Sequence, residues 1–321
     1  MAVQGRVDTV VAGVLCRFFS DNQKDLEVIS DQLKHHVVTV SDQDFPVQHI
    51  AFVGMLYALP VPSTAEVRWK GSFSLVGKQD AGEVVLYRDA SRQMDYYVTN
   101  EGVTICSNSI SHHTICYIPE LLGPNGRKKR MPCSGIFTLL LQTVLLEHAR
   151  YTMHGAGIVC KGCGFLLLGE SGAGKSTLCL DLIKRGCGWL GDDLVVVYEQ
   201  EGKLVMAPLY FSAKLFNTAK TAKKHLDWLT QYRLPKWEHV PLSAVLHVQQ
   251  TRSGESYVTE QTKENCLIYI LNGGNSVPMQ CDAKRWIETA FRISDTIPCY
   301  DFMYGDRALV SSAVLEQIIE S

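Results

Sequence analysis

Residues 169–176 read Gly-Glu-Ser-Gly-Ala-Gly-Lys-Ser, and this stretch decides the fold of the second half of the chain. It fits the pattern G-x-x-x-x-G-K-[ST], whose glycines let backbone N–H groups turn inward around phosphate oxygens. An apolar run at 164–168 precedes it, and an expected helix over 175–185 follows it. That helix would aim the positive end of its dipole at the same anion. The sequence therefore predicts a phosphate-binding loop for a nucleoside triphosphate with magnesium.

Each residue of the loop has an expected role in this interpretation. Lys175 can reach the β- and γ-phosphates, and the hydroxyl of Ser176 can ligate magnesium. The residues expected to bind the cofactor, ATP with Mg²⁺, are Gly169, Glu170, Ser171, Gly172, Ala173, Gly174, Lys175, Ser176 and Thr177.

Two adjacent carboxylates, Asp192 and Asp193, stand one expected strand after the loop. Neighbouring residues on an extended chain point to opposite sides, so in that case one carboxylate would face the metal and the other would face elsewhere. A hydroxyl that accepts a phosphoryl group needs a base to take its proton. We expect both residues to be catalytic, with Asp192 beside Ser176 as the metal ligand. The residues do not decide which Asp is the base, and the alternative is that one Asp only caps a turn.

His154 lies in Met-His-Gly-Ala, just before the strand that leads toward the loop. A lone histidine is more often structural or exposed than catalytic, so its spacing alone does not assign it a role.

The chain divides by pattern into two domains, 1–133 and 134–321. Short apolar runs separated by turn residues make residues 1–120 β-rich, with strands expected at 37–40, 83–87 and 96–99. Gly, Pro and the basic run 127–130 mark a linker at 121–133, and an apolar helix is expected over 136–150.

Strands and helices alternate after residue 150, so the fold class is α/β. Hairpin turns are expected at Lys161-Gly162 and Glu201-Gly202. They join strands 157–160 and 164–168, and strands 194–198 and 203–209. A further strand is expected at 244–248, with helices at 175–185, 217–231, 282–293 and 311–320.

Composition narrows the expected partners and location. The 321 residues carry a formal net charge of -2, which provides no positive field for nucleic acid or an anionic membrane. The longest apolar run, 136–146, is too short to span a bilayer. Eleven cysteines without a framework spacing, and no secretory signal at the start, predict a cytoplasmic protein with reduced thiols. The oligomeric state stays open, a homo-oligomer included.

The order of these motifs resembles that of the catalytic domain of HPr kinase/phosphorylase. The matching residues are His154-Gly155, a hairpin, 169–176, 182–186 and Asp192-Asp193. The resemblance is best over 151–200 and extends more weakly to about 250. It implies a P-loop domain of the HPr-kinase/carboxykinase type, preceded here by the β-rich N-terminal domain.

The resemblance also implies an activity, the phosphorylation of a serine hydroxyl. In this interpretation Lys175 and Ser176 hold ATP and magnesium, the Asp pair supplies a metal contact and the base, and His154 assists at the phosphoryl group. Two departures favour the monofunctional relatives, such as lasso-peptide kinases. Thr177 stands where the family usually has Glu, and the Glu-x-Arg-Gly-x-Gly segment of the phosphorylase reaction has no counterpart.

Other motifs are better explained structurally. The C-x-x-C at 160–163 flanks a hairpin turn and has no second ligand pair for zinc. The basic run 127–130 fits a solvated linker better than a site for an acidic substrate.

The function predicted from the sequence is an ATP-dependent kinase without phosphorylase activity, acting on a serine of a peptide or protein. Two alternatives stay open. One is a kinase of free serine, and the other is a regulator that binds nucleotide without transferring phosphate, for which a base would be superfluous.

Overall fold

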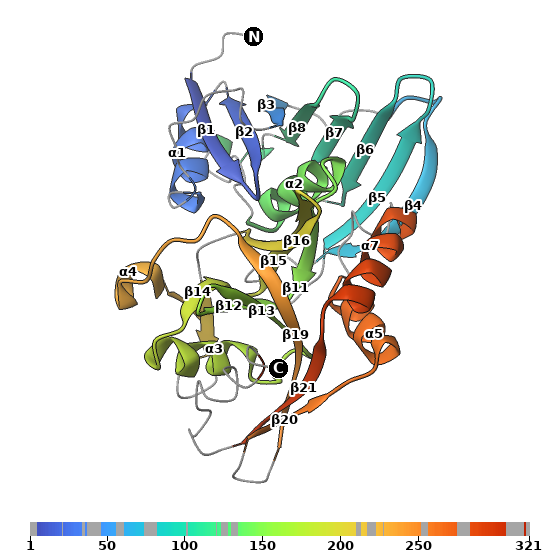
Figure 1. Ribbon diagram of the computed structural model, residues 1–321. Coiled ribbons are helices and arrows are strands. Elements are labelled where there is room, and N and C mark those ends of the chain that lie inside the picture. Colours follow the sequence, from blue (N-terminus) through green and yellow to red (C-terminus); the bar gives the residue numbers. More distant parts are fainter. Residues whose placement is uncertain are drawn as a thin grey trace. The chain divides into compact units, whose positions relative to one another are not determined.

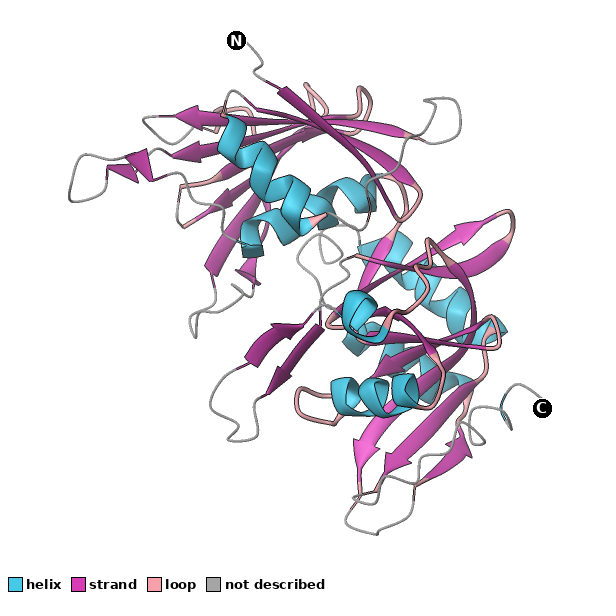
Figure 2. Cartoon of the chain, turned by 90° about the vertical axis from the view of Figure 1, so that its left-hand side faces the viewer, coloured by secondary structure: helices cyan, strands magenta, loops and turns pink. Residues whose placement is uncertain are grey.

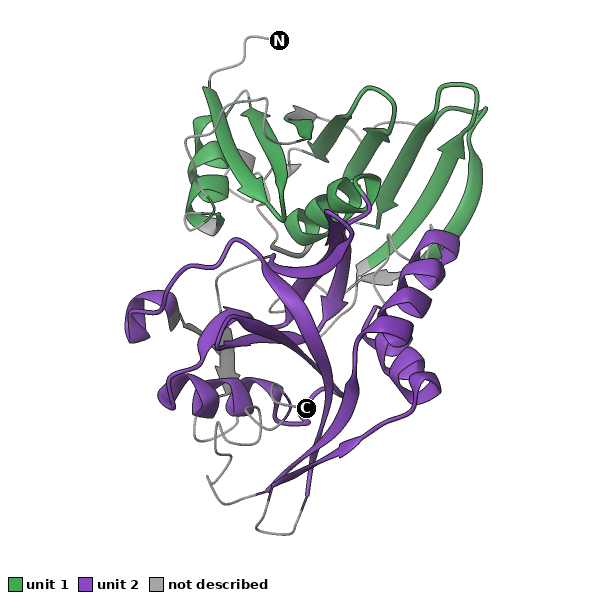
Figure 3. Ribbon diagram, viewed as in Figure 1, with its two compact units in different colours: residues 1–148, 276–282 green, residues 149–275, 283–321 purple. Residues whose placement is uncertain are grey.

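The computed structural model describes residues 5–20, 22–33, 36, 46–55, 61–73, 82–100, 102–119, 121–122, 128–129, 134–209, 213–216, 223–226, 228–251, 256–274, 283–305 and 318. The chain forms two compact units (Figure 3). Unit 1 comprises Met1–His148 with Ser276–Asp282, and unit 2 comprises Ala149–Asn275 with Ala283–Ser321.

Unit 1 is built on an eight-stranded sheet in the order β1-β2-β3-β8-β7-β6-β5-β4. Helices α1 (Gln23–Gln32) and α2 (Ser134–Glu147) lie on the same side of it (Figure 2). The strands are β1 Gly5–Val11, β2 Val14–Ser20, β3 Val47–Met55, β4 Glu66–Phe73, β5 Gly82–Asp89, β6 Met94–Thr99, β7 Thr104–Asn108 and β8 His113–Pro119. The strands predicted at 83–87 and 96–99 lie in β5 and β6. The strand predicted at 37–40 lies outside the described residues.

Helix α2 packs within unit 1, which differs from the boundary at 133–134 expected from the sequence. Its apolar residues are almost fully buried, and the rings of Phe137 and Phe18 lie 5.9 Å apart. At its end, Glu147 accepts a hydrogen bond from Ser107 of β7. Because these contacts hold the helix against the N-terminal sheet, the division of the chain falls after His148.

Unit 2 contains a nine-stranded sheet (Figure 1). Its main path is β11-β15-β16-β19-β13-β12-β14, and β21 pairs with both β19 and β20. The strands are β11 Tyr151–His154, β12 Ala156–Cys160, β13 Cys163–Leu168, β14 Gly188–Gly191, β15 Leu194–Gln200, β16 Lys203–Pro208, β19 Val240–Gln250, β20 Tyr257–Glu260 and β21 Cys299–Tyr304. The mixed α/β character predicted from the sequence is confirmed, whereas the HPr-kinase/carboxykinase type stays a prediction.

Helices cover both faces of this sheet. Helix α3 (Lys175–Lys184) packs its Leu178 and Leu182 into a cluster that includes Leu167 of β13. The next residue, Leu168, points to the other face, where it meets Gly273 of α5 (Lys263–Gly273). Helix α7 (Ala283–Thr296) contacts α5. The alternation of the strand thus sends consecutive leucines into two separate layers.

The two predicted hairpin turns are present. Lys161 and Gly162 have φ of 50° and 81°, and Glu201 and Gly202 have φ of 49° and 78°. Positive φ at both central residues suits the twist of the flanking strands.

One predicted helix is wrong over half of its described length. Residues 223–226, expected in a helix over 217–231, form β18 (Lys223–Leu226), which pairs with β17 (Ala213–Phe216). Only the short α4 (Trp228–Tyr232) is helical. Pairing with β17 satisfies the backbone groups that a helix would have satisfied internally. Residues 217–222 lie outside the described residues.

The other predicted elements have separate outcomes. The strand at 244–248 lies in β19, and the helix at 282–293 corresponds to α7. The expected linker 121–133 contains the paired two-residue strands β9 (Leu121–Leu122) and β10 (Lys128–Lys129). Apart from residue 318, the helix predicted at 311–320 lies outside the described residues. No described helix is both long and apolar enough to span a bilayer.

Candidate active site

The glycine loop joins β13 directly to α3, as the sequence predicts. Gly169 follows the last residue of β13 with φ of 142°, and a Cβ built on it would lie 2.5 Å from the carbonyl oxygen of Val248 in β19. At the other end of the loop, Gly174 caps α3 with φ of 96°. The first glycine is therefore required by close backbone approach, and the second by a left-handed conformation at the helix start.

Lys175 is the first residue of α3 and is only 8% exposed. Its Nζ donates hydrogen bonds to the carbonyl oxygens of Gly169, at 2.6 Å, and Glu170, at 3.0 Å. These bonds hold the ammonium group inside the curve of the loop. Glu170, Ser171 and Thr177 are exposed, so the loop and the first turn of α3 open toward solvent.

A hydrogen bond joins the start of α3 to the Asp pair. The hydroxyl of Ser176 donates to Oδ1 of Asp192 at 2.9 Å, and Asp192 is 4% exposed. Two effects raise the pKa of the Cys179 thiol: burial is the larger, and the negative charge of Asp192 is the second. A hydroxyl and a carboxylate are oxygen donors of the kind that Mg²⁺ prefers beside a phosphate. The pair thus fits the ligand set expected from the sequence.

The extended conformation, under which the two carboxylates would point to opposite sides, is not present at the Asp pair. Asp193 has φ of 69° and lies with Asp192 in a turn between β14 and β15. A two-residue turn orients its carboxylates independently of the strand alternation used for the prediction. The carbonyl oxygen of Asp193 accepts a hydrogen bond from the N–H of Gly155 at 3.2 Å.

His154 lies at the exposed end of β11, opposite Leu194 of β15. This pairing, together with the bond between Gly155 and Asp193, places His154 beside the Asp turn. The sequence spacing alone could not show this, because residues 154 and 193 meet only through the pairing of β11 with β15.

Two residues beside the loop were missed from the sequence, Gln250 and Tyr304. They are paired in the parallel ladder between β19 and β21. A Cβ built on Gly174 would lie 3.4 Å from Cδ1 of Tyr304 and 3.5 Å from Nε2 of Gln250. No motif in the sequence signals them, since residues 250 and 304 are more than fifty positions apart in the chain and meet only in the sheet.

The C-x-x-C has the structural explanation favoured from the sequence. Cys160 and Cys163 are opposite each other at the end of the β12–β13 hairpin, and both are free thiols. The described part of the chain contains no group of three His, Cys, Asp or Glu side chains placed to hold a metal ion.

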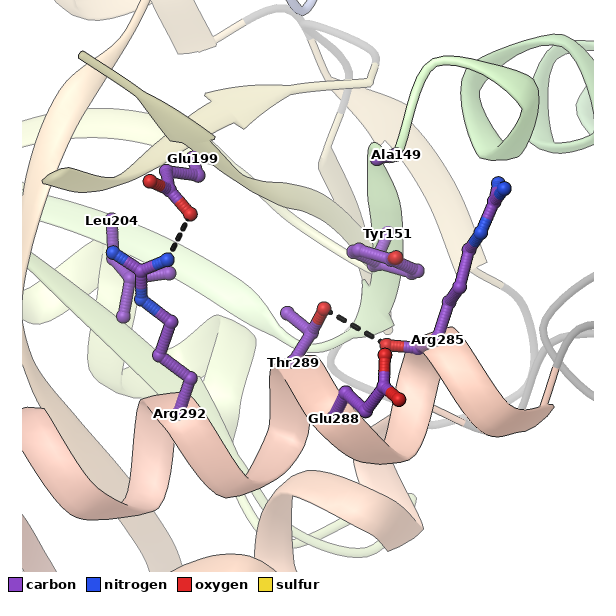
Figure 4. Close-up of a pocket in the computed structure, with 8 residues that line it drawn as sticks. All are labelled: Ala149, Tyr151, Glu199, Leu204, Arg285, Glu288, Thr289 and Arg292. Atoms are coloured by element: carbon purple, nitrogen blue, oxygen red, sulfur yellow. Dashed lines mark hydrogen bonds and ion pairs between the residues drawn. The ribbon is translucent and has the colours of Figure 1, made fainter. Parts of the chain in front are cut away.

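A cavity of about 240 Å³ lies elsewhere in unit 2, and no predicted site residue lines it. Arg292 and Glu199 form an ion pair on one wall, while the side chain of Arg285 points away from that pair (Figure 4). The lining residues are Ala149, Tyr151, Glu199, Leu204, Arg285, Glu288, Thr289 and Arg292.

The family described as the HPr Serine kinase C-terminal domain matches residues 147–216, which hold the loop, the Asp turn and His154. Over these residues the chain is similar to HPr kinases. The HPr kinase/phosphorylase of Lacticaseibacillus casei (strain BL23) is 31% identical over 123 residues, 38% of this chain and 37% of that protein. That of Lactobacillus johnsonii is 30% identical over 135 residues, 42% of this chain and 41% of that protein.

These matches span about two fifths of the length of the curated relatives. Among solved structures, the Hpr(Ser) kinase/phosphatase from Coxiella burnetii is 15% identical and matches with a TM-score of 0.32, covering 53% of this chain and 88% of that one. The family match does not cover the part of the chain outside 147–216, which includes the sheet of unit 1.

Proposed function

We propose that this protein is an ATP-dependent kinase that transfers the γ-phosphoryl group to a serine hydroxyl of a peptide or protein. The observation that carries the proposal is the bond between Ser176 and Asp192, which joins the phosphate loop to an Asp turn beside His154. A loop that only binds nucleotide has no need of a second carboxylate and a histidine next to the phosphate position. The HPr kinase-like match over the same residues supports the same activity.

The loop would hold the phosphates of ATP through its backbone N–H groups and the positive end of α3. Lys175 would turn its ammonium group from the carbonyl oxygens of Gly169 and Glu170 to the β- and γ-phosphate oxygens. The oxygens of Ser176 and Asp192 would hold magnesium, which neutralises charge on the phosphates. The hydroxyl hydrogen with which Ser176 forms its hydrogen bond to Asp192 would then point away from the metal.

The second carboxylate, Asp193, would act as the base. It takes the proton of the serine hydroxyl while that oxygen forms a bond to the γ-phosphorus and the bond from this phosphorus to the bridging oxygen of ADP breaks. His154, exposed at the end of β11, would donate a hydrogen bond to the oxygens of the transferred group. The products are a phosphoserine and ADP.

The acceptor class follows from the resemblance and the departures in sequence. The relatives' names give HPr as their protein substrate. Thr177 and the missing phosphorylase segment favour a one-way kinase, whose substrates would include a lasso-peptide precursor. A kinase of free serine is the second candidate. We also propose that the protein is located in the cytoplasm.

The test is phosphate transfer from ATP to serine-containing peptides and to free serine, followed by mass spectrometry. Lys175→Ala should abolish transfer, whereas Lys184→Ala, an exposed residue at the far end of α3, should retain it. Full activity of Lys175→Ala would overturn the proposal. Nucleotide binding by the wild-type chain without transfer to any acceptor would favour the non-catalytic regulator instead.

A further inference from the structure

The residues that flank the phosphate loop are divided between its two sides. Strand β13, which leads into the loop, pairs with β12 on one side and with β19 on the other. His154 and Gly155 lead into β12, and β14, which leads into the Asp turn, also pairs with β12. The groups proposed for acceptor chemistry therefore all lie on the β12 side of the loop.

The geometry of phosphoryl transfer assigns different roles to the two sides of the loop. The attacking and leaving oxygens lie roughly in line on opposite sides of the transferred phosphorus. If the serine hydroxyl approaches from the side of Asp193 and His154, then ADP must leave toward the opposite side. The nucleoside end of ATP should therefore extend over the ends of β19 and β21.

Gln250 and Tyr304 stand at that place. They are the last residues of β19 and β21 and are directly paired. Both lie in van der Waals range of a Cβ built on Gly174, the residue that caps the start of α3. Gln250 is exposed and Tyr304 is half-buried, so an aromatic ring and a side-chain amide are presented side by side next to the loop.

The position of Tyr304 is fixed by the surrounding structure. Its ring packs against the core cluster beneath α3, and its carbonyl oxygen accepts a hydrogen bond from the N–H of Thr251 at 2.9 Å. A ring held in this way can stack on a base with little loss of side-chain freedom. The amide of Gln250 offers both a donor and an acceptor to a sugar or a base edge.

We infer that Tyr304 and Gln250 form the nucleoside-binding side of the site, with the Tyr304 ring contacting the base of ATP and Gln250 hydrogen-bonding the nucleoside. The inference rests on the proposed function, because it uses the direction of phosphate transfer. It assigns ligand contacts to the β19–β21 edge, whereas the chemical step is assigned to the β12 side.

The experiment compares two probes on the full chain by titration calorimetry with magnesium: ADP, and inorganic tripolyphosphate, which lacks a nucleoside. Stacking of a base on an aromatic ring corresponds to roughly five- to hundredfold in affinity. Tyr304→Ala should weaken the affinity for ADP by about tenfold or more and leave the affinity for tripolyphosphate within about twofold of the wild-type value. Tyr304→Phe should keep ADP binding, and Gln250→Ala should weaken ADP alone.

Tyr300→Ala is the matched control. Tyr300 lies four residues earlier on the same face of β21 and packs against the same core cluster. The Tyr300→Ala substitution should change the affinities for ADP and tripolyphosphate equally or not at all. If Tyr304→Ala weakens the binding of both probes equally, or of neither, the inference is wrong while the proposed function stands. If the wild-type chain binds neither probe, the proposed function itself fails and the inference fails with it.

A second measurement locates the base without any variant. Irradiation of the chain with 8-azido-ADP, followed by mass spectrometry of peptides, should label the segments ending in Gln250 or Tyr304. Labelling of β11 or of the Asp192-Asp193 turn instead would place the nucleoside on the β12 side and overturn the inference.

Discussion

Substitution of Gly169 by alanine should destabilise unit 2 far more than the same change at Gly172. Both glycines have positive φ, 142° and 89°, so both substitutions introduce backbone strain of about 1–2 kcal/mol. They differ in their surroundings. A Cβ on Gly169 would lie 2.5 Å from the carbonyl oxygen of Val248, whereas a Cβ on Gly172 has no heavy atom within 4 Å.

The size of the difference follows from the required movement. Ordinary contact begins near 3.4 Å, so the start of the loop must move about 0.9 Å away from β19. Overpacking of this kind costs about 1–3 kcal/mol, which sets the expected difference between the two variants. With an m-value of about 1–3 kcal/mol/M, the urea midpoint of Gly169→Ala should fall roughly 1 M below that of Gly172→Ala.

Urea unfolding followed by tryptophan fluorescence suits this comparison. Four of the five tryptophans lie in unit 2, and Trp189 is fully buried in the cluster beneath α3. Nucleotide binding should fall in parallel for Gly169→Ala, because the displaced loop no longer aims its N–H groups at one point. Equal midpoints for the two variants would refute the reasoning, since strain at positive φ would then explain the whole effect.

Three further predictions concern the Asp turn, unit 1 and the core beneath the loop. Asp193→Asn should bind Mg-ATP normally but lose about 10²–10⁴-fold in transfer rate, whereas Asp192→Asn should also bind Mg-ATP more weakly; calorimetry of Mg-ATP binding and the rate of phosphate transfer to a serine acceptor separate them. Burial raises the pKa of Glu147 to about 7, so the stability of unit 1 should fall as pH rises from about 4.5 through 7. Glu147→Gln should flatten that pH profile in hydrogen exchange of α2; an unchanged profile would contradict it. Leu182→Ala should cost about 2–5 kcal/mol in urea unfolding, and a loss below 1 kcal/mol would argue against its packed position.

The sign for Glu147 follows from which state binds the proton more tightly. Desolvation favours the protonated carboxyl in the folded chain, while the hydrogen bond from Ser107 acts in the opposite direction and is the smaller effect. The folded state therefore holds the proton at pH values where the unfolded state has lost it. Stability that is present at low pH is lost as the pH rises, by up to about 3 kcal/mol.

Local signals in the sequence were enough for the parts of the fold that depend on neighbours in the chain. Lys161-Gly162 and Glu201-Gly202 predict hairpins because a type I′ turn has positive φ at two successive residues, and both turns have it. Helix α3 was predicted to end before Gly186, and the residue after its cap has φ of 98°. The loop between β13 and α3 belongs to the same class of prediction.

Features that depend on distant pairing could not be predicted in this way. Residues 223–226 have no strong strand pattern, and they are extended because β17 pairs with them. Helix α1 was missed although Asn22 caps it by accepting a hydrogen bond from the N–H of Lys24. The proximity of His154 to Asp193 requires the pairing of β11 with β15, which no local pattern encodes.

The turn formed by Asp192 and Asp193 couples the two proposed carboxylate functions mechanically. Both residues belong to one two-residue link between β14 and β15. Asp192 in this link accepts a hydrogen bond from Ser176, and Asp193 accepts one from Gly155. A displacement of the link moves the metal ligand and the base together. Substitutions at the two aspartates should therefore be non-additive in a double-mutant cycle, and a change at Gly155 should disturb metal affinity although it touches no metal ligand.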